Sequence, residues 1–390
     1  MRHDVIFDPA AQLGRRSFLR AGASALLLAG LAAPLATASD AAARTRRPLM
    51  IDGLGGLGRV DGALSYNDPR AIDAHALADG HASGLAAFNQ TIGYVSGPGD
   101  PFESTVRDIA AWDALIRRRG ADLLKVYTAE DIRQAHASGR IGVILGFQNA
   151  AMMGQDAGRA ALFANLGVKV IQLTYNDRNQ IGDGAIVKEN RGLTPFGHTV
   201  LAELNRNKVL IDLSHSGEQT CLDAIAASAA PVAITHTGCR AVADLPRNKS
   251  DRELRLLADK GGVAGIYFMP FLAIDRQPTA QDLIAHIEHA LQVCGEDHVA
   301  IGSDGTVPRI DDMTHYYAEL KKDVEARRAA GIGAPGERAD IATFLPDLQG
   351  PDKYWRLAEL LQARGHKASV VDKVMGANFL RLADSVWGQA

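Results

Sequence analysis

After residue 48, short apolar runs alternate with longer segments in which apolar positions recur every three or four residues. Eight runs are apolar on both faces, as expected of parallel strands that lie buried between helices. The predicted strands are Leu49–Gly53, Gly84–Asn89, Ile141–Phe147, Val168–Leu173, Val209–Leu213, Val232–Thr235, Gly262–Phe268 and Val299–Gly302. The predicted helices between them are Pro69–Gly80, Phe102–Arg119, Asp156–Asn165, Phe196–Arg206, Glu218–Ser228, Asp251–Lys260 and Thr279–Val293.

This rhythm of strand and helix continues without a break in composition. Eight such repeats predict an α/β fold, a (β/α)8 TIM barrel that forms one domain over residues 49–390. A doubly wound open sheet is the alternative. The charged stretch Glu319–Arg328 predicts a surface helix, and Lys353–Arg364 and Val370–Leu382 predict closing helices with apolar faces.

The first 48 residues have a different pattern. Gly14-Arg-Arg-Ser-Phe-Leu-Arg20 precedes an apolar stretch that ends in the small residues Ala36-Thr-Ala38. Paired arginines, a modest apolar region and such an end are typical of a twin-arginine signal peptide. We therefore expect a signal at residues 1–38, a disordered linker at 39–48, and a periplasmic or secreted protein that meets the twin-arginine export machinery.

Composition narrows the classes of partner. The chain has 390 residues, 47% of them hydrophobic, which is ample for a large core. A net charge of −3 gives no electrostatic reason to expect nucleic acid.

Two histidines stand at the ends of successive predicted strands, His215 after Val209–Leu213 and His236 after Val232–Thr235. Chemistry in an α/β barrel gathers at the C-terminal ends of its strands. Two imidazoles brought there could share one divalent metal ion. Alternatively, each histidine merely caps its strand and bonds a backbone group.

Other polar side chains follow the remaining strands. Gln148 follows the third strand, Tyr175 the fourth and Asp304 the eighth, while Arg247 lies eleven residues beyond His236. Asp304 can accept a proton or bind an ammonium group, and Arg247 can pair with a carboxylate. Tyr175 can donate to a polarised carbonyl, and Gln148 offers a weak amide ligand. The alternatives are a turn residue at Asp304, a surface cation at Arg247, and ordinary wall residues at Gln148 and Tyr175.

Two further features receive a plainer interpretation. His286, Glu288 and His289 lie on an amphipathic helix, where a solvated face is expected rather than a metal site. The glycine-rich stretch Gly53–Gly58 lacks the spacing of a phosphate-binding loop.

Several of these motifs, taken together, resemble the membrane (renal) dipeptidase family of metallopeptidases. The similarity covers roughly residues 49–386, and its motifs occur in the family's order. They are Gly192-Leu-Thr-Pro-Phe-Gly197, Asn205-Arg206, Ile211-Asp-Leu-Ser-His215, Pro231-Val-Ala-Ile-Thr-His236, His298-Val-Ala-Ile-Gly-Ser-Asp304-Gly and Ala377-Asn-Phe-Leu-Arg381. The resemblance implies a distorted barrel of the amidohydrolase type, two zinc ions, dipeptide cleavage and a homodimer.

When the family's residue roles are transferred position by position, the resemblance implies that His215 and His236 are ligands of the second zinc. It also makes Arg247 the carboxylate-binding residue and Asp304 the acid that handles the proton and the substrate amine. The chain departs from the family elsewhere. Leu54 and Gly56 stand where the family has the first zinc's His and Asp ligands.

Two more family positions are changed, because Gln148 replaces the bridging Glu and Tyr175 the carbonyl-polarising His. The sequence therefore predicts a divergent branch with at most one tightly bound zinc ion, held by His215, His236 and Gln148, or with none. The predicted function is hydrolysis of a small peptide or amide by metal-activated water, with Asp304 and Tyr175 as catalytic residues. The alternative is a non-hydrolytic periplasmic peptide-binding or maturation factor.

Overall fold

The structure, a computed structural model, describes residues 48–60, 65 and 67–388. The predicted signal peptide at residues 1–38 lies outside the described residues, as does all of the predicted linker at 39–48 except residue 48. Both therefore stay predictions.

A single path of eight parallel strands follows the chain, in the order β1-β3-β5-β6-β7-β8-β9-β10. The strands on this path are β1 (Met50–Asp52), β3 (Leu85–Thr91), β5 (Ile141–Phe147), β6 (Val168–Gln172), β7 (Leu210–Asp212), β8 (Ala233–Thr237), β9 (Val263–Ile266) and β10 (Val299–Ile301). A doubly wound sheet would reverse its strand order partway, and this sheet does not. The eight strands form a nearly closed barrel with helices between them, as the sequence predicts.

The first and last strands approach each other at the C-terminal end of the barrel. The Gly53 amide, just after β1, donates to the Ile301 carbonyl at the end of β10 over 2.9 Å. Beyond this bond, β2 (Gly55–Gly56) pairs in parallel with β11 (Gly305–Thr306). The loops after β1 and β10 are thus tied together at the barrel mouth.

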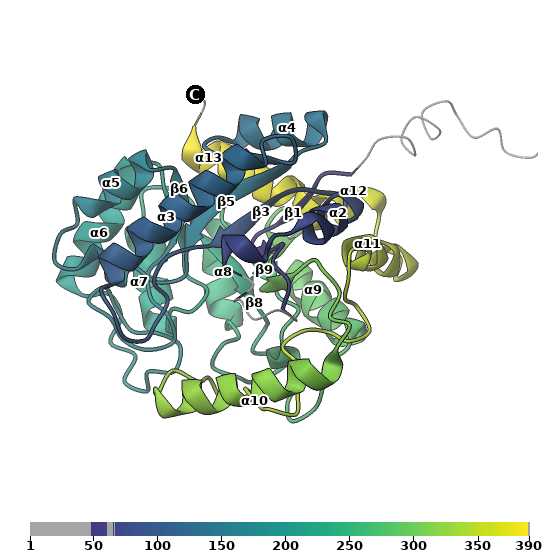
Figure 1. Cartoon of the computed structure of the whole chain (residues 1–390). Coiled ribbons are helices and arrows are strands. Elements are labelled where there is room, and N and C mark those ends of the chain that lie inside the picture. The colour runs from purple at the N-terminus through teal and green to yellow at the C-terminus, as the bar shows by residue number, and fades with distance from the viewer. Residues whose placement is uncertain (1–47, 61–64, 66, 389–390) are drawn as a thin grey trace, which may run out of the picture. The chain divides into compact units, whose positions relative to one another are not determined.

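Helices connect the strands and surround the barrel (Figure 1). They are α2 (Ala74–Ala82), α3 (Pro101–Arg118), α4 (Ala129–Ser138), α5 (Arg159–Asn165), α6 (Pro195–Arg206), α7 (Glu218–Ala227), α8 (Asp251–Asp259), α9 (Ala280–Cys294), α10 (Met313–Ala329), α11 (Lys353–Ala363), α12 (Ala368–Asp372) and α13 (Asn378–Trp387). Short 3-10 turns lie at Pro69–Ala71, Ala151–Met153 and Pro270–Leu272, and a π-helical turn at Lys373–Ala377 joins α12 to α13. None of the helices in the described part of the chain has the length and apolar character that a bilayer crossing requires.

One strand and one helix between the second and third predicted strands were not predicted. They are β4 (Leu123–Lys125), which pairs in parallel with the first three residues of β5, and α4. The α4 helix carries clear local signals, a capping box between Thr128 and Asp131 and a left-handed Gly139 at its C-terminus. The three-residue strand is too short for its periodicity to be seen.

Side chains from all eight strands of the path fill the barrel interior. Each strand contributes one apolar residue to a single buried cluster: Ile51, Ala87, Ile144, Val170, Leu210, Ala233, Val263 and Ala300. Helix α13 adds Phe379, Leu382, Val386 and Trp387 to this cluster and so packs against the barrel interior. In Figure 1, α10 lies at the opposite end of the molecule from α13. The end of the barrel that α13 packs against is thus filled by apolar side chains.

Candidate active site

A cavity of about 660 Å³ lies at the C-terminal ends of the strands, between the strand loops and α10. Five of the six predicted site residues line it: Gln148, Tyr175, His215, Arg247 and Asp304. The sixth, His236, is fully buried next to them, with its Nε2 atom 4.0 Å from Oδ2 of Asp304. The structure therefore brings the whole predicted set together.

The two histidines are held by side chains rather than by backbone groups. His215 Nδ1 lies 2.6 Å from Asn176 Oδ1, and His236 Nδ1 lies 3.0 Å from Thr235 Oγ1. The Asn176 oxygen can only accept, so His215 carries its proton on Nδ1. Thr235 donates its own hydroxyl to Asp212 over 2.7 Å, so it too accepts from the histidine beside it.

Both Nε2 atoms are consequently unprotonated. Both are buried and have no hydrogen-bond partner among the described residues. The two rings have centroids 5.0 Å apart, at an angle of 60°. A buried acceptor left without a partner costs free energy, so two such atoms side by side indicate a position suited to binding a ligand.

Electrostatics keeps these imidazoles neutral. Burial, and next the Arg247 charge, lower the pKa of both histidines well below the usual value. A neutral imidazole with a free Nε2 lone pair is the form that binds a metal ion.

The remaining donors do not support a two-ion centre. Among the described residues, no group of three or more His, Cys, Asp or Glu side chains is placed to hold a metal ion. Leu54 and Gly56 offer no side-chain ligand, and the Gln148 amide nitrogen is engaged with Thr91 Oγ1 at 2.7 Å. The chain's residues thus fit one ion bound through His215 and His236, completed by neutral or external ligands, but they do not fit a pair of ions.

Arg247 is 1% exposed, so the alternative of a surface cation is wrong. Its Nη1 donates to the Ser214 carbonyl at 2.6 Å, while its Nη2 is buried without a partner. The guanidinium is therefore fixed by the backbone beside His215 and still has donors free for an anion.

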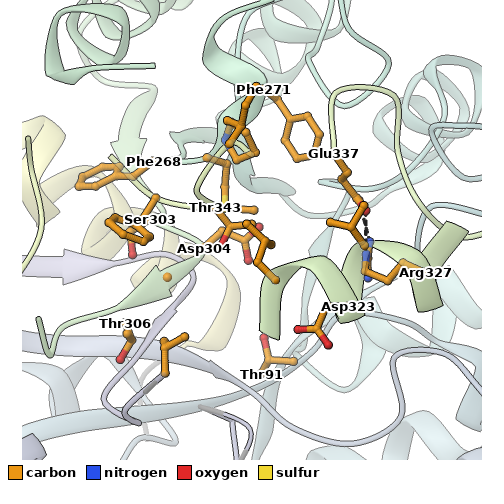
Figure 2. A pocket seen from close by; sticks show the side chains of 18 of the residues that line it. Thr91, Phe268, Phe271, Ser303, Asp304, Thr306, Asp323, Arg327, Glu337 and Thr343 are labelled. Carbon is orange, nitrogen blue, oxygen red and sulfur yellow. Dashed lines mark hydrogen bonds and ion pairs between the residues drawn. The ribbon is translucent and has the colours of Figure 1, made fainter. Parts of the chain in front are cut away.

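Asp304 lies at the centre of the cavity wall, as Figure 2 shows. Its φ of 53° places it in the left-handed region, and its amide donates to the Leu54 carbonyl over 2.8 Å. Burial raises the pKa of its carboxyl to about 7, although the Arg247 charge opposes the shift. A carboxyl with that pKa exchanges protons near neutral pH.

Sequence reasoning missed Arg327, which reaches Tyr175 from α10. The Tyr175 ring stacks on the His215 ring at 4.2 Å between centroids, and the Arg327 guanidinium lies 5.7 Å from the Tyr175 centroid. Arg327 also forms a two-point ion pair with Glu337, with both distances 2.8 Å (Figure 2). Burial raises the pKa of the Tyr175 phenol, so it stays protonated and can donate.

The sequence predicts a surface helix at Glu319–Arg328. The structure shows a longer helix, α10, which also lines the cavity. One side of α10 lines the cavity through Tyr316, Leu320 and Val324, all of which are buried. Their spacing of four residues is one stripe of a helix and could have been found in the sequence.

The prediction of a solvated face is wrong for His286. This side chain is fully buried, accepts from the Cys239 amide at 2.8 Å and contacts the Leu272 carbonyl at 3.0 Å. Burial lowers its pKa to about 4, so it is a neutral structural residue. His289 is partly buried and bonds Asp251 at 2.7 Å.

Comparisons with known proteins agree with this geometry. The family model of membrane dipeptidase (peptidase family M19) matches residues 59–329. The crystal structure of an amidohydrolase from Pseudomonas aeruginosa is 31% identical with a TM-score of 0.74, and the match covers 88% of this chain and 97% of that one.

Two curated relatives add to this result. An uncharacterized protein in the pqqA 5' region of Klebsiella pneumoniae is 28% identical over 303 residues, which is 75% of this chain and 99% of the relative. Dipeptidase verJ of Clonostachys rogersoniana is 30% identical over 233 residues, covering 57% of this chain and only 60% of that dipeptidase. Since the family model covers well over half of the residues, the chain belongs to the membrane dipeptidase family, peptidase family M19.

Proposed function

We propose that this protein hydrolyses dipeptides or closely related amides that carry a free carboxylate, and that it works with a single divalent ion, zinc. Dipeptidases of this family are metal-dependent. The observation that carries the proposal is the pair of buried, unpartnered Nε2 atoms of His215 and His236 beside the unpartnered Nη2 of Arg247. Neutral imidazole ligands suit zinc.

The chain's own residues supply binding and proton transfer. Arg247 offers Nη2 to the substrate carboxylate while the Ser214 carbonyl holds the guanidinium in place. Tyr175 donates its hydroxyl to the carbonyl oxygen on which charge develops. Asp304, with a pKa of about 7, takes up a proton and returns it to the leaving amine. When bound at His215 and His236, with Gln148 as a weak third ligand, a divalent ion would supply the Lewis acidity that activates water.

Export is a second part of the proposal. It rests on the paired arginines Arg15 and Arg16 and the apolar stretch that follows them, all outside the described residues. A precursor with both arginines changed to lysine should stay in the cytoplasm, as fractionation and immunoblotting would report. Normal delivery of that variant to the periplasm would contradict the export proposal.

A non-hydrolytic binding protein is the competing function, and one observation favours it. The described residues provide no acidic ligand set for a metal ion, yet they retain a buried, anion-ready Arg247. A protein that binds peptides without hydrolysing them would still need this arginine but would not need metal ligands.

A panel of dipeptides, including those with D-residues, separates the two functions. The purified mature protein should bind carboxylate-bearing dipeptides in calorimetry, and added zinc should produce turnover that His215→Ala removes. His289→Ala is the matched control, because His289 lies outside the cavity and should leave turnover unchanged. Binding without any turnover under saturating zinc would favour the binding protein.

A further inference from the structure

Lys353, the first residue of α11, is a buried cation that the proposed function does not use. Its side chain is 3% exposed and lines the cavity. Its Nζ donates to the Thr306 carbonyl at 3.0 Å and lies 3.5 Å from Ser303 Oγ. The ammonium also faces the rings of Tyr354 and Phe268, with 4.8 Å and 5.6 Å to the centroids.

This ammonium lacks a carboxylate partner. In the described part of the chain, no carboxylate oxygen forms an ion pair with Lys353 within 4.0 Å. Asp52 acts on the ammonium electrostatically, but its Oδ2 already accepts from the Ser303 and Tyr354 hydroxyls at 2.5 Å and 2.6 Å, and its Oδ1 accepts from the Ser303 amide at 2.7 Å. An ammonium has three donors, and two contacts account for two of them.

The position of Lys353 matters more than its burial. Its partner Thr306 belongs to β11, which pairs with Gly55–Gly56 of β2. Gly56 is one of the two positions where the family's ligands of a first metal ion are replaced. A fixed positive charge therefore lies against the strand pair from which one of those two ligands is missing.

Arg247 provides a second buried cation without a carboxylate partner. Its guanidinium carbon lies 6.0 Å from the Tyr267 centroid, whereas Lys353 lies beside the next residue, Phe268. The two cations thus stand beside successive residues after β9, and both line one cavity. Arg327, by contrast, is neutralised by Glu337. In Figure 2, Phe268, Ser303 and Thr306 gather on one side of Asp304, and Arg327 and Glu337 lie on the other.

Burying a cation without a direct carboxylate partner is unfavourable, and two such cations in one cavity also repel each other. A ligand with two anionic groups relieves both costs at once. We propose that Lys353 binds a second carboxylate of the substrate, so that the natural ligand is a dipeptide or peptide-like compound with an acidic side chain. This proposal rests on the proposed function, in which Arg247 binds the first carboxylate.

The test measures binding of alanyl-aspartate and alanyl-asparagine by calorimetry with a metal chelator present, so that turnover cannot interfere. The two dipeptides differ only in the charge of one side-chain group. Unmodified protein should bind the aspartate form about tenfold or more tightly than the asparagine form, as a charge-assisted hydrogen bond in a buried site gives. Lys353→Met should reduce this ratio to about one, and Lys353→Arg, which keeps the charge, should retain part of it.

Lys169 offers a matched control. It is also a buried lysine whose pKa burial lowers to about 8, as for Lys353. Its Nζ donates to the Lys208 carbonyl at 3.1 Å and lies 5.6 Å from the Trp387 centroid, but it does not line the cavity. Lys169→Met should therefore leave the aspartate-to-asparagine ratio unchanged.

The outcomes separate this proposal from the function on which it rests. A ratio near one in unmodified protein, or an unchanged ratio in folded Lys353→Met, would overturn the second carboxylate site while leaving the proposed function in place. If Lys353→Met does not fold, Lys353→Gln takes its place. A ratio near one in Lys353→Gln would support the second carboxylate site, and an unchanged ratio would overturn it. Arg247→Ala should weaken both dipeptides equally, and failure of both to bind unmodified protein would contradict the proposed function itself.

Discussion

His215 after β7 and His236 near the end of β8 occupy one side of the barrel mouth, and Leu54 and Gly56 after β1 occupy another. On the β7 and β8 side, the imidazoles and the hydrogen bonds that orient them are both present. On the β1 side, the backbone frame is present, since β2 pairs with β11 and Gly53 bonds Ile301, but the ligand side chains are missing.

The comparison shows that the frame and the chemistry of a barrel mouth are separable. Backbone pairing and the buried Asp52 network shape the β1 side without any metal ligand. A lysine ammonium, that of Lys353, lies against this frame and donates to the Thr306 carbonyl. The function therefore depends on the side chains at the mouth of the barrel and not on the barrel fold alone.

The largest expected effect concerns the side that keeps its imidazoles. His215→Ala and His236→Ala should each lower zinc affinity by about 100-fold or more, because each removes one of two strong ligands. Competition with a chromogenic chelator measures this affinity. His289→Ala serves as the control, and equal zinc affinity in all three variants would place the ion elsewhere.

A smaller effect is expected from the residue that orients His215. Asn176→Ala removes the acceptor that holds the proton on Nδ1, so the ring loses its fixed tautomer. Zinc affinity should fall by about tenfold, the size typical of such supporting bonds. Asn176→Asp should restore affinity, because a carboxylate also accepts from Nδ1. An unchanged affinity in Asn176→Ala would show that the bond orients nothing.

The smallest effect concerns the side with Lys353 and depends on pH. Burial lowers the pKa of Lys353 to about 8, so its positive charge is present below that pH and lost above it. The titratable groups beside it are the Asp52 carboxylate and the Tyr354 phenol, whose pKa is raised well above 10. Asp304 lines the same cavity, and its pKa of about 7 means that it gains a negative charge at the lower end of this range, so Lys353→Met is measured in parallel to isolate the contribution of the lysine.

The preference for alanyl-aspartate over alanyl-asparagine should therefore fall severalfold between pH 7 and pH 9.5. Both dipeptides share the same amino group, so its titration cancels in the ratio. Calorimetry across this range gives the profile. A preference that stays constant to pH 9.5 would exclude Lys353 as its source.

Much of this fold and site could be predicted from the sequence. Buried parallel strands are apolar on both faces, and their ends marked His215, His236 and Asp304 as residues of one mouth. The place of Arg247, eleven residues beyond His236, made it a candidate but left a surface cation as the alternative, since nothing local distinguishes it from a surface arginine.

Other residues could not be placed because their position depends on tertiary packing. Lys353 begins an ordinary amphipathic helix, where a lysine usually lies in solvent. Arg327 lies in a charged helix whose apolar stripe is only three residues long. Its contact with Tyr175 depends on how that helix packs over the barrel, which the local sequence does not indicate. His286 lies close to the polar residues Glu288 and His289 in the sequence, yet α9 turns it into the interior.

The difference between the two sides of the mouth is tested most directly by counting metal ions in the purified mature protein. Elemental analysis after dialysis against zinc should give no more than about one ion per chain, since only two strong side-chain ligands are present. An anomalous difference map should place that ion at Nε2 of His215 and His236. Two fully occupied ions per chain, one of them beside Leu54 and Gly56, would contradict the account.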